Sequence, residues 1–312
     1  MLAFRAMIAP LLGAFLVFAQ TATPFGAASR PVECTALDGS RVANVWERAK
    51  SPALRRYCDL LASATSKLAG STGMSNEVLA IADEADKAVP GRAAPSVLRG
   101  RAQARLGKYT EAYAALHDAK AKDERALDDP ASLLAWARVA LRTGHAEEAR
   151  EAYRQLLPRA SALPISDRGP AYVEAGLLAM ARGPAGLEEA IAIFRQARRD
   201  AQDVEQTVAV LALGLALDRS GERDEARAVI AERVHGDPRG VLSDARARKV
   251  VDPATSSAEM DAIAAVALEA WDPALAREAW HRYVEAASSS PWIEHARQRE
   301  AGLNGKRASK PK

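Results

Sequence analysis

The sequence is poor in aromatic residues and in cysteine. Only 5% of its 312 residues are Phe, Trp or Tyr, and it has two cysteines and five histidines. A β-sandwich would need many more aromatic and β-branched residues, so this composition argues against that class. The formal net charge of +3, from 43 basic and 40 acidic residues, is too balanced to predict binding to nucleic acid.

Motifs that carry catalysis or bind metals are also missing. There is no H-E-x-x-H, no cysteine cluster, no G-x-S-x-G and no glycine-rich phosphate loop. The histidines are scattered, without the i, i+4 spacing of a helical zinc pair: His117, His145, His235, His281 and His295. We therefore expect no enzyme activity, no cofactor and no metal, and histidines placed on the surface or at helix ends.

What the sequence does contain is alanine, which makes up about a fifth of the chain (70 residues). Alanine has the highest helix propensity and lets neighbouring helices approach closely. Because 48% of the residues are apolar, the chain can also bury enough surface to offset the entropy lost on ordering. These features predict closely packed helices.

The N-terminus has the pattern of an export signal. Arg5 precedes an apolar run from about residue 6 to 19, which is shorter than the ~20 residues of a membrane span. Small residues permit cleavage after Ala19 or Ala28. We expect residues 1–28 to be a signal peptide and linker, with the mature protein periplasmic or in the cell envelope and without a membrane span. An uncleaved N-terminal anchor is the alternative.

The cysteines and the C-terminal tail fit an exported chain. Cys34 and Cys58 form a disulfide if the compartment is oxidising, and two unpaired thiols are the alternative. Residues 29–56 then form an N-terminal cap segment. Residues 305–312 carry four basic and no acidic residues, which predicts a disordered tail that aids solubility or contacts an anionic surface.

The central part of the chain repeats itself. Glycines recur at 107, 144, 183 and 221, at spacings of 37, 39 and 38 residues. An alanine lies five residues after each glycine, and a bulky residue lies four residues after that alanine. In the copy after Gly183, however, two extra residues separate the glycine from the alanine. These alanine and bulky pairs are Ala112 and Leu116, Ala149 and Tyr153, Ala190 and Phe194, and Ala226 and Ile230. A last copy has Ala276 before Trp280, and a degenerate first copy surrounds Gly73.

Each repeat is predicted to be two helices. An apolar-periodic stretch precedes each glycine, which ends the helix where a left-handed backbone is needed. Acidic residues such as Glu147, Glu148, Glu188 and Glu189 follow at the start of the second helix, where the helix dipole favours them. Close approach at the alanine then brings the two helices together.

This pattern resembles the tetratricopeptide repeat family, in particular an exported bacterial protein of that kind. Gly100, Gly176 and Gly214 match the glycine of the family's first helix, seven residues before the turn glycine. The resemblance implies an all-α, right-handed α-solenoid of stacked antiparallel helix pairs, with about five repeats over residues 57–286. A loose connection with one short helix is expected over residues 235–257. We expect a C-terminal capping helix at 287–304, with Ser290 as its cap, Pro291 at its first position and Trp292 packed on the last repeat.

In that family the concave face, lined by the first helices, binds partners. Mapped onto this sequence, the family's positions include Arg101, Arg105, Arg138, Arg142, Leu177 and Arg219. Beyond the arginine pairs the predicted groove turns apolar through Val173, Leu177, Met180 and Leu211. Paired arginines suit carboxylates, so the resemblance implies a groove for a peptide or partner protein with acidic residues and an apolar anchor. Pairing of these arginines with the chain's own Asp and Glu is the alternative. The implied function is a non-enzymatic interaction scaffold, with a structural or self-associating spacer subunit as the second possibility.

Overall fold

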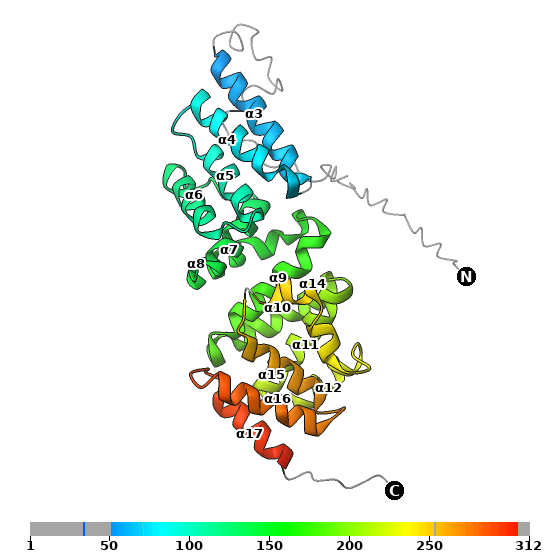
Figure 1. The fold of residues 1–312 in the computed structure, drawn as a ribbon. Coiled ribbons are helices and arrows are strands. Elements are labelled where there is room, and N and C mark those ends of the chain that lie inside the picture. Colours follow the sequence, from blue (N-terminus) through cyan, green and yellow to red (C-terminus); the bar gives the residue numbers. More distant parts are fainter. Residues whose placement is uncertain (1–33, 35–50, 71, 253, 305–312) are drawn as a thin grey trace, which may run out of the picture.

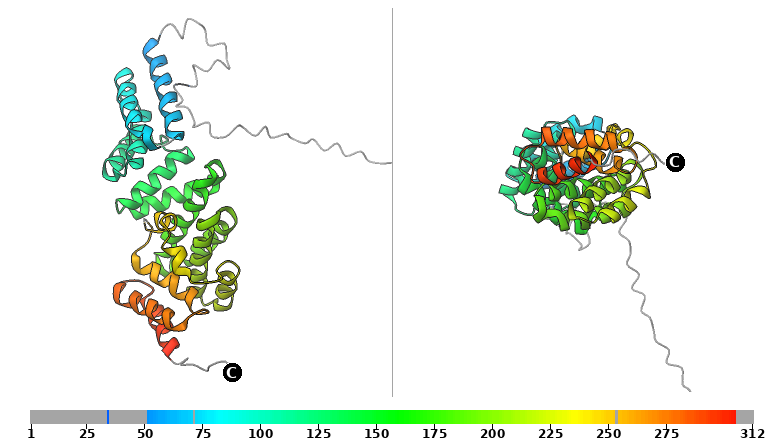
Figure 2. Two further views of the ribbon diagram at one scale, coloured as in Figure 1. Left: turned by 45° about the vertical axis from the view of Figure 1, so that its right-hand side comes forward. Right: turned by 90° about the horizontal axis from the view of Figure 1, so that it is seen from below.

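The computed structural model describes residues 34, 51–70, 72–252 and 254–304. The predicted signal segment, most of the N-terminal cap and the basic tail therefore lie outside the described residues. The described part is all α-helical and contains no strand, and its helices form one long stack from α3 to α17 (Figure 1). From a second direction the stack is again longer than it is wide (Figure 2). None of the described helices is long and apolar enough to cross a bilayer.

Six antiparallel helix pairs make up most of this stack. The first helices of the pairs are α3 (Pro52–Ala69), α5 (Ala93–Arg105), α7 (Pro130–Arg142), α9 (Ile165–Met180), α11 (Asp203–Ser220) and α15 (Ser257–Leu268). The second helices are α4 (Ser75–Ala88), α6 (Tyr109–Lys122), α8 (Ala146–Leu156), α10 (Leu187–Asp200), α12 (Arg223–Ala231) and α16 (Pro273–Ala286). Each first helix packs on its second helix, and each pair packs on the next. This confirms the all-α solenoid of stacked helix pairs, and the degenerate first copy forms the complete pair α3–α4.

The turns between paired helices have the predicted backbone. Gly107, Gly144, Gly183 and Gly221 all have positive φ, between 73° and 92°. Residues with a Cβ rarely adopt this conformation, which explains why glycine recurs there. Short 3₁₀ segments also connect helices: η1 (Thr72–Met74) lies between α3 and α4, η2 (Leu157–Ala162) follows α8, and η3 (Gly183–Gly186) precedes α10.

Close packing inside each pair depends on the other glycines of the repeat. An added Cβ at Gly100 would lie 2.5 Å from the side chain of Leu116, and one at Gly214 would lie 2.5 Å from that of Ile230. The bulky residue of the second helix therefore occupies the space that a side chain on the first helix would fill. The small and bulky pattern read from the sequence is the contact that joins the two helices.

A disulfide joins Cys34 to Cys58 of α3, with the two Cα atoms 5.6 Å apart. Cys34 is buried in the cluster that also holds Tyr57, Leu61 and Ala82. The bond therefore fixes position 34 against the first helix pair.

The connection after α12 differs from the prediction of one short helix. It contains two, α13 (Pro238–Leu242) and α14 (Ala245–Val251), each capped by an aspartate side chain. α14 contacts both α9 and α11, and its Val250 and Val251 are buried in their core cluster. The segment is thus a packed part of the C-terminal half of the fold.

The C-terminal helix α17 (Ile293–Asn304) packs on α16, but the residues before it reach much farther back. The indole Nε1 of Trp292 donates a hydrogen bond to the carbonyl oxygen of Met180, at the end of α9, over 3.0 Å. The prediction that Trp292 packs on the last repeat therefore missed its contact with α9, two repeats earlier. The helix also begins at Ile293, after the predicted Pro291, and Ser290 Oγ accepts a bond from the Trp292 N–H.

Buried ionic contacts fix α17 to α11 as well. Asp218, only 2% exposed, accepts a hydrogen bond from His295 Nε2 over 2.8 Å and forms an ion pair with Arg299 at 3.3 Å. Arg299 also pairs with Glu269, the C-cap residue of α15. A buried charge is stable only when it is paired and hydrogen-bonded, so this network fixes how α11, α15 and α17 meet.

Candidate functional site

The first helices form the inner face of the solenoid. α3 contacts α5, α5 contacts α7 and α9 contacts α11, whereas no comparable contact joins successive second helices among the described residues. A stack in which one layer of helices is closer together than the other curves toward the closer layer. The predicted site residues all lie on these first helices, so they can be considered along one surface.

The C-terminal half of this surface is not an open groove. Val173, Leu177, Met180 and Leu211 are at most 2% exposed and belong to one core cluster with residues of α13, α14 and α17. Their prediction as an apolar binding surface is wrong, because the chain's own α14 and Trp292 cover them. Every residue of α11 from Val208 to Arg219 is buried, so this helix has no free face.

Arg219 is also enclosed. Its side chain is 1% exposed, and its Nη2 lies 2.8 Å from Glu259 Oε2 of α15. The guanidinium lies over the ring of Trp292, with its central carbon 4.7 Å from the ring centroid. Arg219 therefore stabilises the contact between α11, α15 and the C-terminal segment, and it is not accessible to a partner.

Arg138 is paired within the chain. Its Nε donates to both carboxylate oxygens of Glu174 at 3.0–3.1 Å, and its Nη1 lies 3.1 Å from Asp167. Tyr153 Oη donates to the same Glu174 over 2.6 Å. Burial acts to lower the pKa of Arg138, but the charges of Glu174, Tyr153 and Asp167, together with the hydrogen bond to Glu174, outweigh burial and raise the pKa. This network joins α7, α8 and α9. For Arg138, the alternative considered above, pairing with the chain's own acidic residues, is therefore correct.

The remaining three arginines, Arg101, Arg105 and Arg142, occupy the inner face of α5 and α7. Arg105 and Arg142 are exposed and Arg101 is half-buried. Arg105 Nη1 donates to the carbonyl oxygen of Gly70 over 3.2 Å, and the Arg142 guanidinium lies 4.7 Å from the centroid of the Tyr109 ring. None of the three forms an ion pair with a described acidic residue. They are the accessible part of the predicted site.

Arg101 carries a charge that its surroundings do not neutralise well. Burial lowers the pKa of its guanidinium, the carboxylate of Asp129 raises it and the neighbouring charge of Arg105 lowers it further. Asp129 itself accepts a hydrogen bond from the Ser132 N–H, as the N-cap of α7. The carboxylate of Asp129 therefore interacts both with the N-terminus of α7 and with the charge of Arg101.

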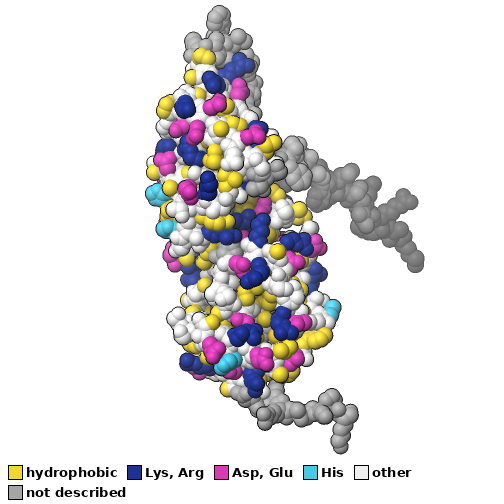
Figure 3. Space-filling model, viewed as in Figure 1, with side chains coloured by type: hydrophobic (Ala, Val, Ile, Leu, Met, Phe, Trp, Pro, Cys, Tyr) yellow, Lys and Arg dark blue, Asp and Glu magenta, His cyan; other side chains and the backbone are white. Residues whose placement is uncertain are grey.

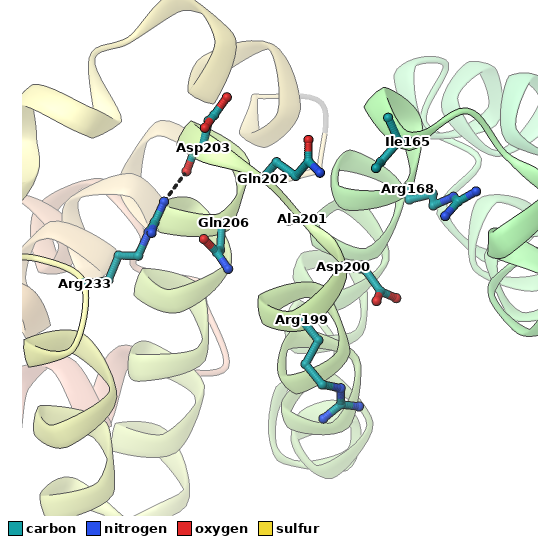
Figure 4. A pocket seen from close by; sticks show the side chains of 9 residues that line it. All are labelled: Ile165, Arg168, Arg199, Asp200, Ala201, Gln202, Asp203, Gln206 and Arg233. Atoms are coloured by element: carbon teal, nitrogen blue, oxygen red, sulfur yellow. Dashed lines mark hydrogen bonds between the residues drawn. The ribbon is translucent and has the colours of Figure 1, made fainter.

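A polar cleft that sequence reasoning did not identify lies where α9, α10 and α11 meet (Figure 4). Its cavity volume is about 560 Å³, and it is lined by Ile165, Arg168, Arg199, Asp200, Ala201, Gln202, Asp203, Gln206 and Arg233. Arg233 donates to the carbonyl oxygen of Asp203 and to Thr207 Oγ1, and Arg168 donates to two backbone carbonyls. These arginines therefore stabilise the cleft wall through hydrogen bonds to the chain's own backbone and to Thr207. In the sequence, only the arginines and aspartates clustered around the α10–α11 turn indicate this cleft.

The described residues do not include a group of three or more His, Cys, Asp or Glu that is able to hold a metal ion. Histidines instead contact side chains of other helices, as His295 does with Asp218. His281 Nδ1 lies 2.9 Å from Glu300 Oε1, and the ring of His145 stacks on that of Tyr113 with centroids 4.1 Å apart. Charged side chains of both signs are interspersed over the face of the molecule seen in Figure 3.

No protein-family model matches this chain, and no curated protein matches it. Among solved structures, it is similar to one chain of the "Crystal structure of APC/C hetero-tetramer Cut9-Hcn1", with 14% sequence identity and a TM-score of 0.36. The alignment covers 86% of this chain and 50% of that one, so this chain spans about half the length of that protein. A similarity this weak carries no argument, and the fold assignment depends on the helix pairs described above.

Proposed function

We propose that the chain is a non-enzymatic scaffold that binds another protein on the inner face of α5 and α7. One observation carries this proposal: the predicted site residues of α9 and α11 are buried by the chain itself, whereas Arg105 and Arg142, the last residues of α5 and α7, are exposed and form no ion pair with a described residue. Arg101, one turn before Arg105 on α5, is half-buried and also forms no ion pair with a described residue. A stacked repeat array buries its core between neighbours, which leaves a preformed surface as its natural means of acting.

The experiment is site-specific photo-crosslinking in the cells that produce the protein. A photoreactive residue replaces Arg105 or Arg142 on the inner face, and the control variants carry it at Glu151 or Arg195 on second helices. Protein adducts are expected from the inner-face positions and not from the controls. Equal adducts from all four positions, or adducts from the second helices alone, would overturn the proposal. Adducts that contain only this chain would favour the self-associating spacer instead. In that case the mass of the purified protein, measured by light scattering, should also rise with its concentration.

We also propose that the protein is exported to the bacterial envelope. The basic and apolar N-terminal sequence supports this, as does the disulfide, because disulfides persist in oxidising compartments. The intact mass of the protein purified from its native cells is the test. A mature N-terminus at residue 20 or 29, with Cys34 and Cys58 oxidised, is expected. A chain that retains residue 1 in the cytoplasmic fraction with both thiols free would contradict export.

A further inference from the structure

Five arginines lie on α5 and α7, and they differ in how the chain neutralises them. Arg99 pairs with Asp83 at 2.8 Å, and Arg138 pairs with Glu174 and Asp167. Arg101, Arg105 and Arg142 form no ion pair with any described residue. The chain therefore pairs two of the five charges and leaves three, of which Arg105 and Arg142 are exposed and Arg101 is half-buried.

These three side chains still have donors to offer. A guanidinium has five N–H donors, and Arg105 uses one in its bond to the Gly70 carbonyl. The Arg142 guanidinium lies over the Tyr109 ring and donates no hydrogen bond to a described residue, so its N–H groups are available to a planar acceptor. Arg101 donates no hydrogen bond to a described residue, although it is partly withdrawn from water. An arginine in that position is stabilised by a carboxylate supplied from outside.

The spacing of the arginines limits the shape of the ligand. Arg101 and Arg105 are four residues apart on α5, which separates them by about 6 Å along the helix axis. In an extended peptide, side chains at positions i and i+2 point to the same side and are about 6.6 Å apart. Two carboxylates with one residue between them therefore match the two arginines. Arg142, on the adjacent first helix at a typical separation of about 8–10 Å, is placed for a third acidic group.

We propose that Arg101, Arg105 and Arg142 form a binding site for an extended acidic segment of a partner protein, in which acidic residues alternate with other residues. This inference rests on the proposed scaffold function and adds the chemical class of its ligand.

Three synthetic peptides of twelve residues test the proposal, each labelled with fluorescein and followed by fluorescence anisotropy. The first alternates Glu and Ser, the second replaces every Glu with Gln, and the third has the same number of Glu and Ser residues as Glu-Glu-Ser-Ser repeats. The protein is the full chain with its disulfide intact. The alternating peptide is expected to bind at least tenfold more tightly than the Gln peptide and measurably more tightly than the third peptide, with affinity falling as salt increases.

The variant Arg101→Gln/Arg105→Gln/Arg142→Gln is expected to weaken binding of the alternating peptide at least tenfold. A matched control, Arg154→Gln/Arg195→Gln/Arg198→Gln, removes the same charge from exposed arginines on second helices and should change Kd less than twofold. Circular dichroism and thermal unfolding are the control that both variants are folded. Equal weakening by the two variants would reduce the effect to net charge and overturn the site. No binding of the acidic peptide would also overturn it, while crosslinked adducts at Arg105 and Arg142 would still support the scaffold.

Discussion

Phe194 of α10 lies directly against the backbone of Gly176 in α9, so closely that a Cβ on Gly176 would be 2.4 Å from Phe194 Cε1. The two residues are the small and bulky members of one repeat. Because the ring has no space to move within the core, replacing this glycine should separate the two helices.

Gly176→Ala is therefore expected to lower the free energy of unfolding by about 1–3 kcal/mol, as overpacking of a core does. Denaturant unfolding followed by circular dichroism measures it. Gly302→Ala in α17 is the control, because nothing lies within 4 Å of its added Cβ and alanine favours a helix. If the two variants were equally stable, the proposed contact between the paired helices would be wrong.

Glu174→Leu should destabilise the junction of α7, α8 and α9 by about 3–5 kcal/mol, because it leaves the Arg138 charge without its main partner. Adding Arg138→Met removes that uncompensated charge and should recover much of the loss. The double-mutant cycle in urea measures the coupling. Additive effects of the two substitutions would mean that the ion pair does not join these helices.

Reduction of the Cys34–Cys58 disulfide, or Cys58→Ser, should destabilise the first helix pair by about 3 kcal/mol in the chain-entropy model, given a sequence separation of 24 residues. Amide hydrogen exchange is the measurement, since it resolves local opening. Protection should fall in α3 and α4 and stay unchanged in α15 and α16. A uniform loss of protection along the chain would contradict a local role for the bond.

Stability should also fall in alkali because of Tyr283. Burial, followed by the charge of Glu259, raises the pKa of Tyr283 to about 12 from 10.0. Between about pH 10 and 12 the unfolded chain loses this proton while the folded chain keeps it, so the free energy of unfolding decreases as pH rises. Urea titrations across this range should show a shallower decrease for Tyr283→Phe than for the wild type. Identical slopes would show that Tyr283 titrates normally.

Local features of the fold were predictable from the sequence. The glycine turns and the close helix pairs depend on residues of a single repeat, such as Gly176 and Phe194. The stacking of repeats follows from the glycine spacing of 37–39 residues. The partner of Arg138 was not predictable, because Glu174 belongs to the next repeat and shows no distinct pattern. The contact of Met180 with Trp292 joins residues 112 positions apart, which no periodicity encodes.

One signal in the sequence does indicate the covered part of the inner face. The segment from Val208 to Leu217 is apolar at every position, and a helix that is apolar all round is buried all round. Extending the predicted apolar groove through Leu211 placed a binding surface on a stretch of helix that is buried. By contrast, α5 and α7 each end in an arginine, Arg105 and Arg142, and these arginines are the exposed residues of the two helices.

The contact of Trp292 with Met180 closes the C-terminal half into a loop, whereas the N-terminal pairs touch only their neighbours. Under force or mild denaturant, α3 to α8 should come apart one pair at a time from the end, as in a linear array. The segment from α9 to α17 should open as one unit, and it should also fold more slowly, because its ends must meet before its contacts form. The protein thus combines a series of separable modules with a single cooperative block.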